Sequence, residues 1–531
     1  MKILLIKPPT NHFKNTAPPV SGIPLGLAYI ASSLKATGHN VRIYDAIVNA
    51  PEERWDCRES ENIICLGATF DEIADVVAEA NPDVVGVTSQ FTSQVGNVIK
   101  IAQTVKKVNQ SIKVVVGGPH ATVAPDSFFQ NDQSVDYVVR GEGEFTMPAL
   151  LECFSGLRDI ESVKGVTYRS GEKIINNEPA GNISDIDVLP LPAYELLDME
   201  RYFYFNLKGK DTRERYLYPG SERSVTMITS RGCPFSCIFC SIHLVMGHRF
   251  RANSADHVLK HIQLLKDKYR VAHIHFEDDN FSFDISRFNA ILDGIISRRL
   301  EITWDAPNGV RADYLNESIL EKCKNSGCTY LRIGVESANE HVSKNIIRKH
   351  LDLKKVTEIA KASNKVGIDL DAFYVIGFPG EKIRQMRETI NFAVSQERKY
   401  GLFPYMFTAT PLLGTRLYEI VRKNGYISKD LLPENFATST QGEGMIATED
   451  FTPGDIEKLL RNYKIKHGLS RVIFALKYFL FHPSYLFTRI FDAFIKKPHK
   501  ALLNEGLKAF IRDIFFIRYK NCINRKVGEN K

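Results

Sequence analysis

The pattern that most constrains the fold is an alternation of strand-like and helix-like runs over residues 1–150. Four runs have the composition of buried strands: KILLIK, NVRIYDA, VVGVTS and KVVVGG. Three runs between them have helical periodicity: PLGLAYIASSLKATGH, DEIADVVAEANPD and QVGNVIKIAQTVKKVN. This alternation predicts a Rossmann-like, doubly wound α/β sheet. Ligands of such sheets bind at the carboxyl ends of the strands, which here carry Thr88, Ser89, Gly117, Gly118 and Pro119.

A second alternation begins near residue 224 and contains six strand-like runs: SVTMITS, AHIHFEDD, EITWDAP, YLRIGVES, DAFYVIGFPG and YMFTATPLLGT. Six strands with helical crossovers predict a partial (β/α)6 TIM-like barrel, whose active site would lie at the carboxyl ends of the strands. We therefore expect four regions. They are a doubly wound domain at 1–150, a proline-stiffened linker at 151–215, the barrel at 216–430, and a basic, mostly helical extension at 431–531.

Composition favours a globular protein in a reducing compartment. Of 531 residues, 44% are hydrophobic and 25% are charged. MKILLIKPP is too short an apolar run for a signal peptide, and no run reaches the roughly 18 apolar residues of a membrane span. We therefore expect a cytoplasmic protein in which cysteines bind metal rather than form disulfides.

Charge is distributed unevenly along the chain. Residues 461–531 contain 16 Lys and Arg against 4 Asp and Glu, a charge of +12, so the preceding residues carry −5 of the total +7. Two basic amphipathic runs lie in this tail, SYLFTRIFDAFIKKPHK and ALLNEGLKAFIRDIFFIRYK. They could lie on the inner face of an anionic membrane or pack on the barrel with a solvated basic edge. No nucleic-acid recognition module is present, so we expect no nucleic-acid partner.

Three cysteines follow the first barrel strand in the pattern C-x3-C-x2-C: Cys233, Cys237 and Cys240. Thiolates are the usual ligands of iron–sulfur clusters, and three of them leave one corner of a four-iron cluster open to an outside ligand. A structural zinc ion would need a fourth ligand, for which His243 is a candidate. Three buried free thiols are the remaining alternative.

The loop CPFSCIFC, with an aromatic Phe239 before the last cysteine, resembles the signature of the radical S-adenosylmethionine (SAM) enzymes. The resemblance implies that a [4Fe-4S] cluster binds the amino and carboxylate groups of SAM at its open iron. It also implies that reduction of the cluster cleaves SAM to a 5′-deoxyadenosyl radical, which abstracts hydrogen from a substrate.

Further motifs resemble the SAM-binding motifs of that family in the same order. HFEDDNF makes Glu277, Asp278 and Asp279 candidates for the SAM amino group, although the two aspartates could instead cap a helix. RIGVES would place Glu336 and Ser337 at the ribose, and YVIGFPGE would place the backbone at Gly377 against adenine. Arg311 would face the SAM carboxylate or be an ordinary surface arginine.

The front domain resembles the cobalamin (B12)-binding domain found ahead of many radical SAM domains, through PLGLAYIASSLKATGHNVRIYDA, NPDVVGVTSQ, VVVGGPHAT and DYVVRGEGE. The corrin and its tail would then be held by the five strand-end residues Thr88, Ser89, Gly117, Gly118 and Pro119. The motif D-x-H-x-x-G, whose histidine ligates cobalt, is missing, so we expect His12 and His120 to form local hydrogen bonds. The alternative is a nucleotide-type domain that binds no corrin.

Together the resemblances imply a cobalamin-dependent radical SAM enzyme that methylates an unactivated carbon or a phosphinate centre. One alternative is an enzyme similar to the anaerobic magnesium-protoporphyrin ester cyclase, which would oxidise or rearrange a tetrapyrrole or lipid without methyl transfer. Another is a non-catalytic corrin- or metal-binding sensor. The expected partners are a small-molecule or lipid-like substrate and an electron donor such as flavodoxin or ferredoxin.

Overall fold

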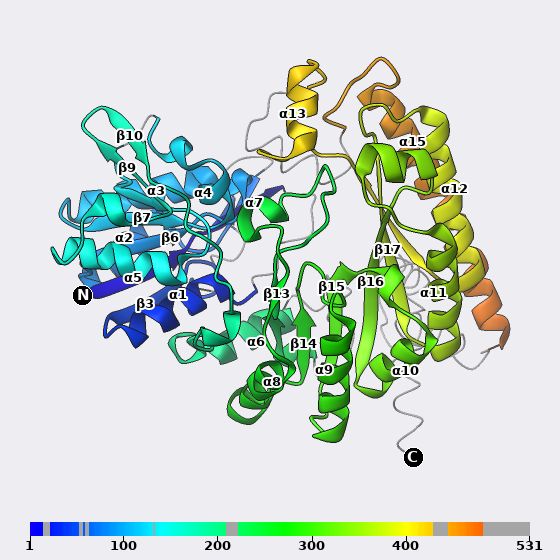
Figure 1. The fold of residues 1–531 in the computed structure, drawn as a ribbon, viewed down its shortest axis with the longest axis horizontal. Helices are drawn as coiled ribbons and strands as arrows, with labels where there is room; N and C mark the ends of the chain where they lie inside the picture. Colours follow the sequence, from blue (N-terminus) through cyan, green and yellow to red (C-terminus); the bar gives the residue numbers. More distant parts are fainter. Residues whose placement is uncertain are drawn as a thin grey trace, which may run out of the picture.

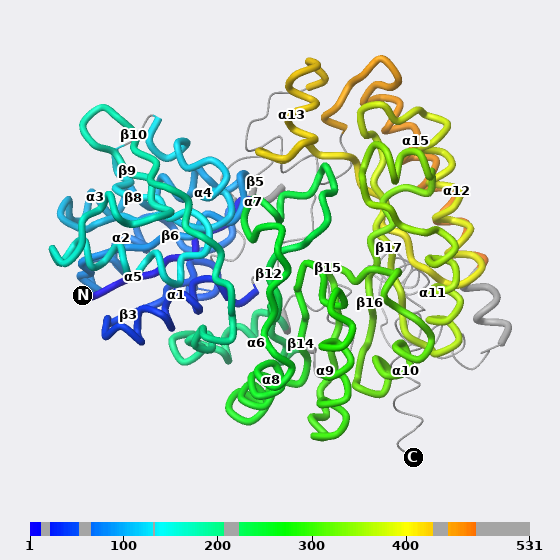
Figure 2. The backbone as a smooth tube through the Cα atoms, in the orientation of Figure 1, coloured from blue at the N-terminus to red at the C-terminus, as the bar shows by residue number. Residues whose placement is uncertain are grey.

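Two α/β units lie side by side in the computed structural model, which describes residues 1–13, 22–51, 57–58, 63–130, 133–208, 221–427 and 444–481. The N-terminal unit is drawn in blue and cyan in Figure 1, and the second unit in green and yellow. The short helix α7 (Ile242–Met246) of the second unit lies at the boundary between the two, as the backbone trace in Figure 2 also shows.

The N-terminal unit is built on a seven-stranded sheet with the order β10-β9-β8-β7-β6-β1-β3. Its parallel strands are β1 (Lys2–Lys7), β3 (Asn40–Asp45), β6 (Val84–Thr88), β7 (Lys113–Gly117) and β8 (Tyr137–Val139). A separate three-stranded antiparallel sheet contains β2 (Thr10–Phe13), β5 (Ile63–Leu66) and β4 (Cys57–Arg58). The four strands predicted from the sequence are β1, β3, β6 and β7.

Helices cover both faces of this sheet. On one face are α1 (Leu25–Ala36) and α5 (Gly143–Phe154), and on the other are α2 (Phe70–Ala80) and α3 (Val95–Val108). Successive side chains of β1 enter alternate cores, since Ile3 and Leu5 pack in one and Leu4 and Ile6 in the other. Burial on both faces explains why these strands are continuously apolar, and the doubly wound prediction is confirmed.

The region 151–215 departs from its description as a connector. The hairpin of β9 (Val166–Ser170) and β10 (Lys173–Asn176) continues the first sheet, because β9 pairs antiparallel with β8. The sheet therefore extends beyond residue 150, and its distal edge is antiparallel. The rest of this region contains helix α6 (Met199–Lys208), which contributes Tyr202 and Phe203 to the core of the barrel.

The second unit is a six-stranded parallel sheet in chain order. Its strands are β11 (Ser224–Met227), β14 (His273–Phe276), β15 (Thr303–Val310), β16 (Cys328–Glu336), β17 (Asp369–Ile376) and β18 (Phe403–Thr408). Between them run α8 (Ala255–Tyr269), α9 (Ile285–Ser297), α10 (Glu317–Asn325), α11 (Leu353–Val366) and α12 (Ile383–Tyr400). This arrangement confirms the partial (β/α)6 barrel.

Helices cover the outer face of the barrel, and alternate strand residues point to its inner face. Ile274, Trp304 and Leu331 belong to the core beneath the helices. Their neighbours His273, His275 and Asp305 therefore point inward. A short antiparallel pair, β12 (Ser230–Arg231) with β13 (Arg251–Ala252), brackets the cysteine loop.

The C-terminal part adds α13 (Arg416–Lys423) and α15 (Pro453–Phe481), of which α15 packs along α12 (Figure 1). Tyr463 and Leu459 of α15 lie in a core with α12 residues. None of the helices within the described residues is both long and apolar enough to cross a membrane. The two basic runs expected at a membrane or on the barrel lie outside the described residues.

Candidate active site

The three cysteines lie on a loop at the carboxyl edge of the barrel, between β11 and α7. Backbone hydrogen bonds hold the loop in place: the amide of Cys233 donates to Gly247 O over 3.3 Å, and the amide of Ile238 donates to Ile347 O over 3.1 Å. Phe239, the aromatic residue of the motif, packs against Phe378, with ring centroids 5.8 Å apart. The signature phenylalanine therefore joins the cysteine loop to the turn after β17.

Gly232 lets the chain enter this loop. Its φ is +81°, and a Cβ there would lie 2.4 Å from Arg249 O, so a side chain cannot be accommodated without moving the backbone. The backbone at Gly232 lies close to the segment 246–249. The glycine before the first cysteine is thus a steric requirement of the loop.

The environment of the three thiols combines burial with nearby positive charge. Burial raises the pKa of Cys233, Cys237 and Cys240, for Cys240 to about 12, whereas the charges of Lys349 and Arg311 act in the opposite direction at Cys233 and Cys237. If the three cysteines hold an iron–sulfur cluster, they would bind it as thiolates, and the charges of Arg311 and Lys349 would favour that form.

A single zinc ion does not fit this loop. Bonds of about 2.3 Å would require sulfur atoms about 3.8 Å apart in a tetrahedral site. Among the described residues, ligand atoms of three His, Cys, Asp or Glu side chains converge within 4.8 Å on β14 and β15, and not at the cysteine loop. His243, the candidate fourth ligand, instead stacks on His248 with ring centroids 4.7 Å apart. A four-iron cluster fits better, since its ligands bind separate irons.

Asp278 follows β14 and is fully buried beneath the start of the cysteine loop. Its carboxylate accepts hydrogen bonds from the Thr229 amide (3.1 Å), the Thr229 hydroxyl (2.8 Å) and the Ser230 hydroxyl. Asp278 thus ties the end of β14 to the residues that precede the cysteines. The alternative that the aspartates of this motif cap a helix is wrong, because Asp284 caps α9 by accepting from the Arg287 amide.

Asp279 lies next to the thiols. Burial and the adjacent charge of Asp278 raise its pKa to about 7, and its charge in turn acts on Cys233 and Cys240. An incoming ammonium group would restore the ionised carboxylate. Glu277, the first acid of the motif, has its backbone tied to the neighbouring strands, since its amide donates to Met227 O and its carbonyl accepts from Asn308 Nδ2.

Glu336 ends β16 in a left-handed conformation, with φ at +64°. Its carboxylate pairs with Lys349, with Nζ and Oε1 2.7 Å apart and both side chains at most 11% exposed. Gly334 leaves room for the pair, because a Cβ there would lie 2.4 Å from Lys349 Nζ. Sequence reasoning missed Lys349, since nothing in the run IRKH sets it apart from other lysines.

Arg311 follows β15 and is only 11% exposed, so the alternative of an ordinary surface arginine is wrong. Its guanidinium pairs with Asp313 (2.6 Å), lies 4.0 Å from the ring centre of Phe235 in the cysteine loop, and donates to Lys349 O. The structure therefore gathers Arg311, Lys349 and Glu336 around the cysteine loop.

Ser337 and Gly377 lie at the next two strand ends. The hydroxyl of Ser337 is buried, lies 3.2 Å from the hydroxyl of Thr389 on α12, and accepts a hydrogen bond from the Asn339 amide over 3.2 Å. Gly377, with φ at +91°, donates its amide to Glu381 (2.8 Å). Burial raises the pKa of Glu381 to about 7. Glu381, the acid of the GFPGE run, is a second residue that sequence reasoning missed, although it lies within the quoted motif.

The strand ends of the N-terminal sheet form the second part of the site. Thr88 ends β6 opposite Gly117, which ends β7, and Pro119 begins the short helix α4 (Pro119–Val123). Gly118 has a φ of +105°, and a Cβ there would lie 2.9 Å from Ser89 O. Only glycine allows the two strand-end turns to approach this closely.

Two polar side chains at these turns behave differently. The Ser89 hydroxyl is fully buried and finds no hydrogen-bond partner among the described residues. His120 has both ring nitrogens engaged, 3.0 Å from Thr92 Oγ1 and 3.2 Å from Ser127 Oγ, and burial lowers its pKa to about 4. The expectation that His120 forms local hydrogen bonds is confirmed. His12 has no described side chain.

The two strand-end surfaces meet. Helix α4 of the N-terminal unit packs against α7, which directly follows the cysteine loop (Figure 1). Val123 of α4 and Leu244 of α7 both lie about 3 Å from the position that a Cβ on Gly414 would take. The site at the N-terminal sheet and the cysteine loop of the barrel are therefore adjacent parts of one region.

A buried ionic network fixes this junction. Glu142, just after β8, accepts from Arg231 (2.8 Å) and Arg251 (2.8 Å), and Glu144 accepts from Arg231 (2.6 Å). All four side chains are at most 10% exposed. Burial alone would raise the pKa of Glu142, but the two arginines hold it below its usual value. Arg231 lies two residues before Cys233. The network thus couples the N-terminal unit to the cysteine loop.

Two family models match the chain at these two units. The B12 binding domain matches residues 16–151, and the Radical SAM superfamily matches residues 227–393. A relative covering nearly the whole chain, uncharacterized methyltransferase PH0819 of Pyrococcus horikoshii, is 31% identical over 512 residues, which are 96% of this chain and 98% of that protein. The chain belongs to the family of radical SAM enzymes that carry an N-terminal B12-binding domain.

Two further similarities span most of the molecule. Cytidylyl-2-hydroxyethylphosphonate methyltransferase of Streptomyces wedmorensis is 26% identical over 481 residues, 86% of this chain and 87% of that protein. The solved structure of the cobalamin-dependent S-adenosylmethionine radical enzyme OxsB superposes with a TM-score of 0.64 at 16% identity, covering 99% of this chain and 80% of that chain. The similarity to OxsB shows that the two proteins share a fold.

The residues at the two strand-end surfaces fit the cofactors of this family. Three half-buried thiols with adjacent cations suit an iron–sulfur cluster, and an ionisable acid next to them suits the ammonium of SAM. On the N-terminal side, the partnerless Ser89 hydroxyl and the tight turn at Gly118 suit a ligand that hydrogen-bonds to the strand ends. The enzyme is thus a radical SAM protein that uses a [4Fe-4S] cluster, SAM and cobalamin.

Proposed function

We propose that this enzyme is a cobalamin-dependent methyltransferase that acts on an unactivated carbon or a phosphinate centre of a small molecule. The observation that supports methyl transfer most directly is the junction of α4 with α7, which brings the two cofactor surfaces together. When bound, the cluster supplies the electron that cleaves SAM, and cobalamin supplies the methyl group. Two cofactors bound in one region would hold the reactive species close to their target.

For SAM, we assign its amino group to Asp279, with Glu277 beside it, and the ribose to the strand end at Glu336. Arg311 and Lys349 are the cations available to the SAM carboxylate, and both act on the thiols. Asp278 is a positioning residue in this assignment, because its carboxylate already accepts from Thr229. The hydroxyl of Ser337 and the amide of Gly377 likewise bond to neighbouring protein groups, so these two residues would shape the ribose and adenine sites through their backbone.

For cobalamin, we assign the corrin and its tail to the turns after β6 and β7. Ser89 would donate to the ligand, and Thr88, Gly117, Gly118 and Pro119 would form the wall through backbone atoms. Since both nitrogens of His120 are engaged by neighbouring hydroxyls, His120 is unsuited to bind cobalt.

We place the functional boundaries at residues 1–150 for the cobalamin domain and 216–430 for the radical SAM barrel. The segment 151–215 joins them and adds the β9–β10 hairpin to the first sheet. The region 431–531 would form the C-terminal extension. Reductive cleavage of SAM also needs a one-electron donor, for which a flavodoxin or ferredoxin has the required chemistry. Contact between the basic tail and a membrane stays a prediction, because those segments lie outside the described residues.

The test uses anaerobically purified protein reconstituted with iron, sulfide and cobalamin. We expect about four irons and about one cobalt per chain. With a low-potential reductant and SAM labelled in its methyl group, label should pass to the bound cobalamin with S-adenosylhomocysteine as co-product. On addition of cytidylyl-2-hydroxyethylphosphonate, or another phosphonate or carbon substrate, 5′-deoxyadenosine should appear as well.

Two variants separate the possible outcomes. Cys240→Ala should lose iron and 5′-deoxyadenosine, whereas Gly118→Val should lose cobalt and S-adenosylhomocysteine while keeping iron. A wild-type enzyme that releases 5′-deoxyadenosine but never S-adenosylhomocysteine would overturn methyl transfer and indicate cyclase-like chemistry. A protein that binds cobalt and iron but cleaves no SAM under reduction would indicate a sensor instead.

A further inference from the structure

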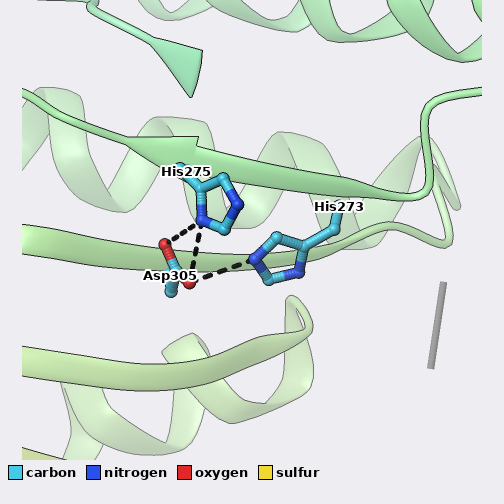
Figure 3. A group of neighbouring side chains, drawn as sticks. All are labelled: His273, His275 and Asp305. Carbon is cyan, nitrogen blue, oxygen red and sulfur yellow. Dashed lines mark hydrogen bonds and ion pairs between the residues drawn. The ribbon is translucent and has the colours of Figure 1, made fainter. Parts of the chain in front are cut away.

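A second group of ligand-type side chains, His273, His275 and Asp305, comes from two neighbouring strands of the barrel (Figure 3). His273 and His275 are two residues apart on β14, so both point to the inner face of the sheet. In the register of β14 with β15, His275 pairs with Asp305. Two imidazoles and one carboxylate from neighbouring strands therefore converge.

The three side chains are close together and removed from water. His275 Nδ1 lies 2.8 and 3.0 Å from the two carboxylate oxygens of Asp305, and His273 Nε2 lies 3.1 Å from Asp305 Oδ2. The side chains of His273 and Asp305 are 0% exposed, and that of His275 is 3% exposed. One ligand atom from each residue lies within 4.8 Å of the others.

The Thr303 hydroxyl contacts the ring of His273 on the side away from Asp305. Its oxygen lies 2.7 Å from His273 Nδ1 and 3.2 Å from Ala272 O. The other ring nitrogen, Nε2, faces a carboxylate oxygen of Asp305, and either a proton or a metal ion can lie between these two atoms.

We propose that His273, His275 and Asp305 bind one divalent transition-metal ion, Zn²⁺ or Fe²⁺, inside the barrel. Metal bonds of about 2.1 Å place neighbouring ligand atoms about 3.4 Å apart in a tetrahedral zinc site and about 3.0 Å apart in an octahedral iron site, and the observed nitrogen–oxygen distances are 2.8–3.1 Å. Two imidazoles with one carboxylate favour these ions over Mg²⁺ or Ca²⁺, which prefer oxygen ligands. The Thr303 hydroxyl orients His273 as outer-shell groups orient metal-bound histidines.

The site can be measured without the iron–sulfur cluster. In the full-length chain carrying Cys233→Ala, Cys237→Ala and Cys240→Ala, Zn²⁺ is titrated by equilibrium dialysis and counted by mass spectrometry. We expect about one tightly bound zinc per chain. Asp305→Asn should abolish it, and Thr303→Val, which keeps the shape of the side chain, should weaken it roughly 10- to 100-fold.

The matched control is His257→Gln. His257 of α8 and Asp187 of the segment 151–215 form a two-membered histidine–aspartate pair with atoms 3.5 Å apart, and its loss should leave zinc binding unchanged. X-ray absorption at the zinc edge should show imidazole and oxygen ligands without sulfur, and this measurement does not depend on the variants folding. Sulfur ligands at the zinc would overturn the proposal. So would zinc binding no stronger than that of the Asp305→Asn variant, and the group would then hold a buried proton instead.

Discussion

At the scale of single residues, two adjacent carboxylates after β14 have different surroundings. Asp278 accepts hydrogen bonds from the Thr229 amide and hydroxyl, so it anchors the cysteine loop. Asp279 is close enough to Cys233 and Cys240 to act on their charges, and its pKa is raised to about 7. The sequence does not distinguish the two aspartates, but their contacts make Asp278 a positioning residue and Asp279 a candidate ligand of the SAM ammonium.

Asp279→Asn should weaken SAM binding in the reconstituted enzyme by roughly 10- to 100-fold, because a charge-assisted hydrogen bond is worth about 1.5–3 kcal/mol. In the wild type, SAM affinity should also fall as the pH drops below about 7, since protonation removes the charge of a carboxyl group with that pKa. Equilibrium dialysis of SAM between about pH 6 and pH 8 measures both effects. If the variant keeps the wild-type affinity and pH profile, the ammonium binds elsewhere, with Glu277 as the next candidate.

Glu381→Gln should flatten the pH dependence of stability. Burial raises the pKa of Glu381 from 4.5 to about 7, so between these values the folded state binds more protons than the unfolded chain. The free energy of unfolding therefore falls as the pH rises from about 4.5 to about 7, by about 1–3 kcal/mol from this group, and levels off above that. Glutamine can still accept the amide of Gly377, so the backbone contact is retained. The free energy of unfolding, measured by urea unfolding at several pH values in this range, should depend less steeply on pH in the variant than in the wild type. An identical pH dependence in the two proteins would contradict the raised pKa of Glu381.

At the scale of elements, parallel strands bring the ends of distant segments to one edge. The cysteine loop and the turns after β14, β15, β16 and β17 all meet at the carboxyl edge of the barrel, as the topology requires. The turns are tight where backbones approach, most clearly at Gly118, whose Cβ would meet Ser89 O. Strand order was predictable because the strands follow one another in sequence, whereas the shape of each turn was not.

Gly118→Ala should reduce the cobalt content of the purified protein. A left-handed φ of +105° and a contact of 2.9 Å with Ser89 O oblige the turn to move, at a cost of about 1–3 kcal/mol. The control is Gly96→Ala on α3, where an added Cβ meets nothing within 4 Å. The cobalt content per chain and the thermal unfolding temperature should both fall for Gly118→Ala, and neither should fall for Gly96→Ala. A Gly118→Ala protein with full cobalt would show that the turn tolerates a side chain.

At the scale of the whole molecule, the two units are joined by charges that neither could bury alone. Arg231 and Arg251 of the barrel share Glu142 of the N-terminal unit, and the ring of Tyr29 lies 5.5 Å from the Arg231 guanidinium. Buried charges are tolerated only when they are paired. The docking of the two units and the position of the cysteine loop are therefore linked.

Glu142→Gln should destabilise the protein by about 3–5 kcal/mol, because it leaves two buried arginines without their shared counter-charge. It should also lower the iron content, since Arg231 lies next to the cysteine loop. The control is Glu79→Gln, which removes the exposed partner of Arg42, with side chains 71% and 48% exposed, and should change stability far less. Chemical unfolding and iron analysis measure the two effects. Equal losses of stability and iron in Glu142→Gln and Glu79→Gln would argue against a special role for the junction.

The sequence by itself determined four strands of the first sheet, the six strands of the barrel and the cysteine loop. Strand runs are recognisable because burial on both faces demands continuous apolar residues, as in KVVVGG, and the spacing of Cys233, Cys237 and Cys240 is local. The aspartates after β14 and the glycine-rich turn after β7 were also predicted as strand-end residues, because their place follows from the topology.

Only the tertiary structure decided which side chains act together. Lys349 pairs with Glu336 across 13 residues, Arg231 with Glu142 across 89, and His275 with Asp305 across 30. The β9–β10 hairpin joins a sheet whose other strands come from before residue 150. Such contacts depend on how strands and helices pack, and a single sequence encodes that packing only through the sum of many weak interactions. Local patterns therefore indicate where chemistry lies, and the folded chain selects the partners that perform it.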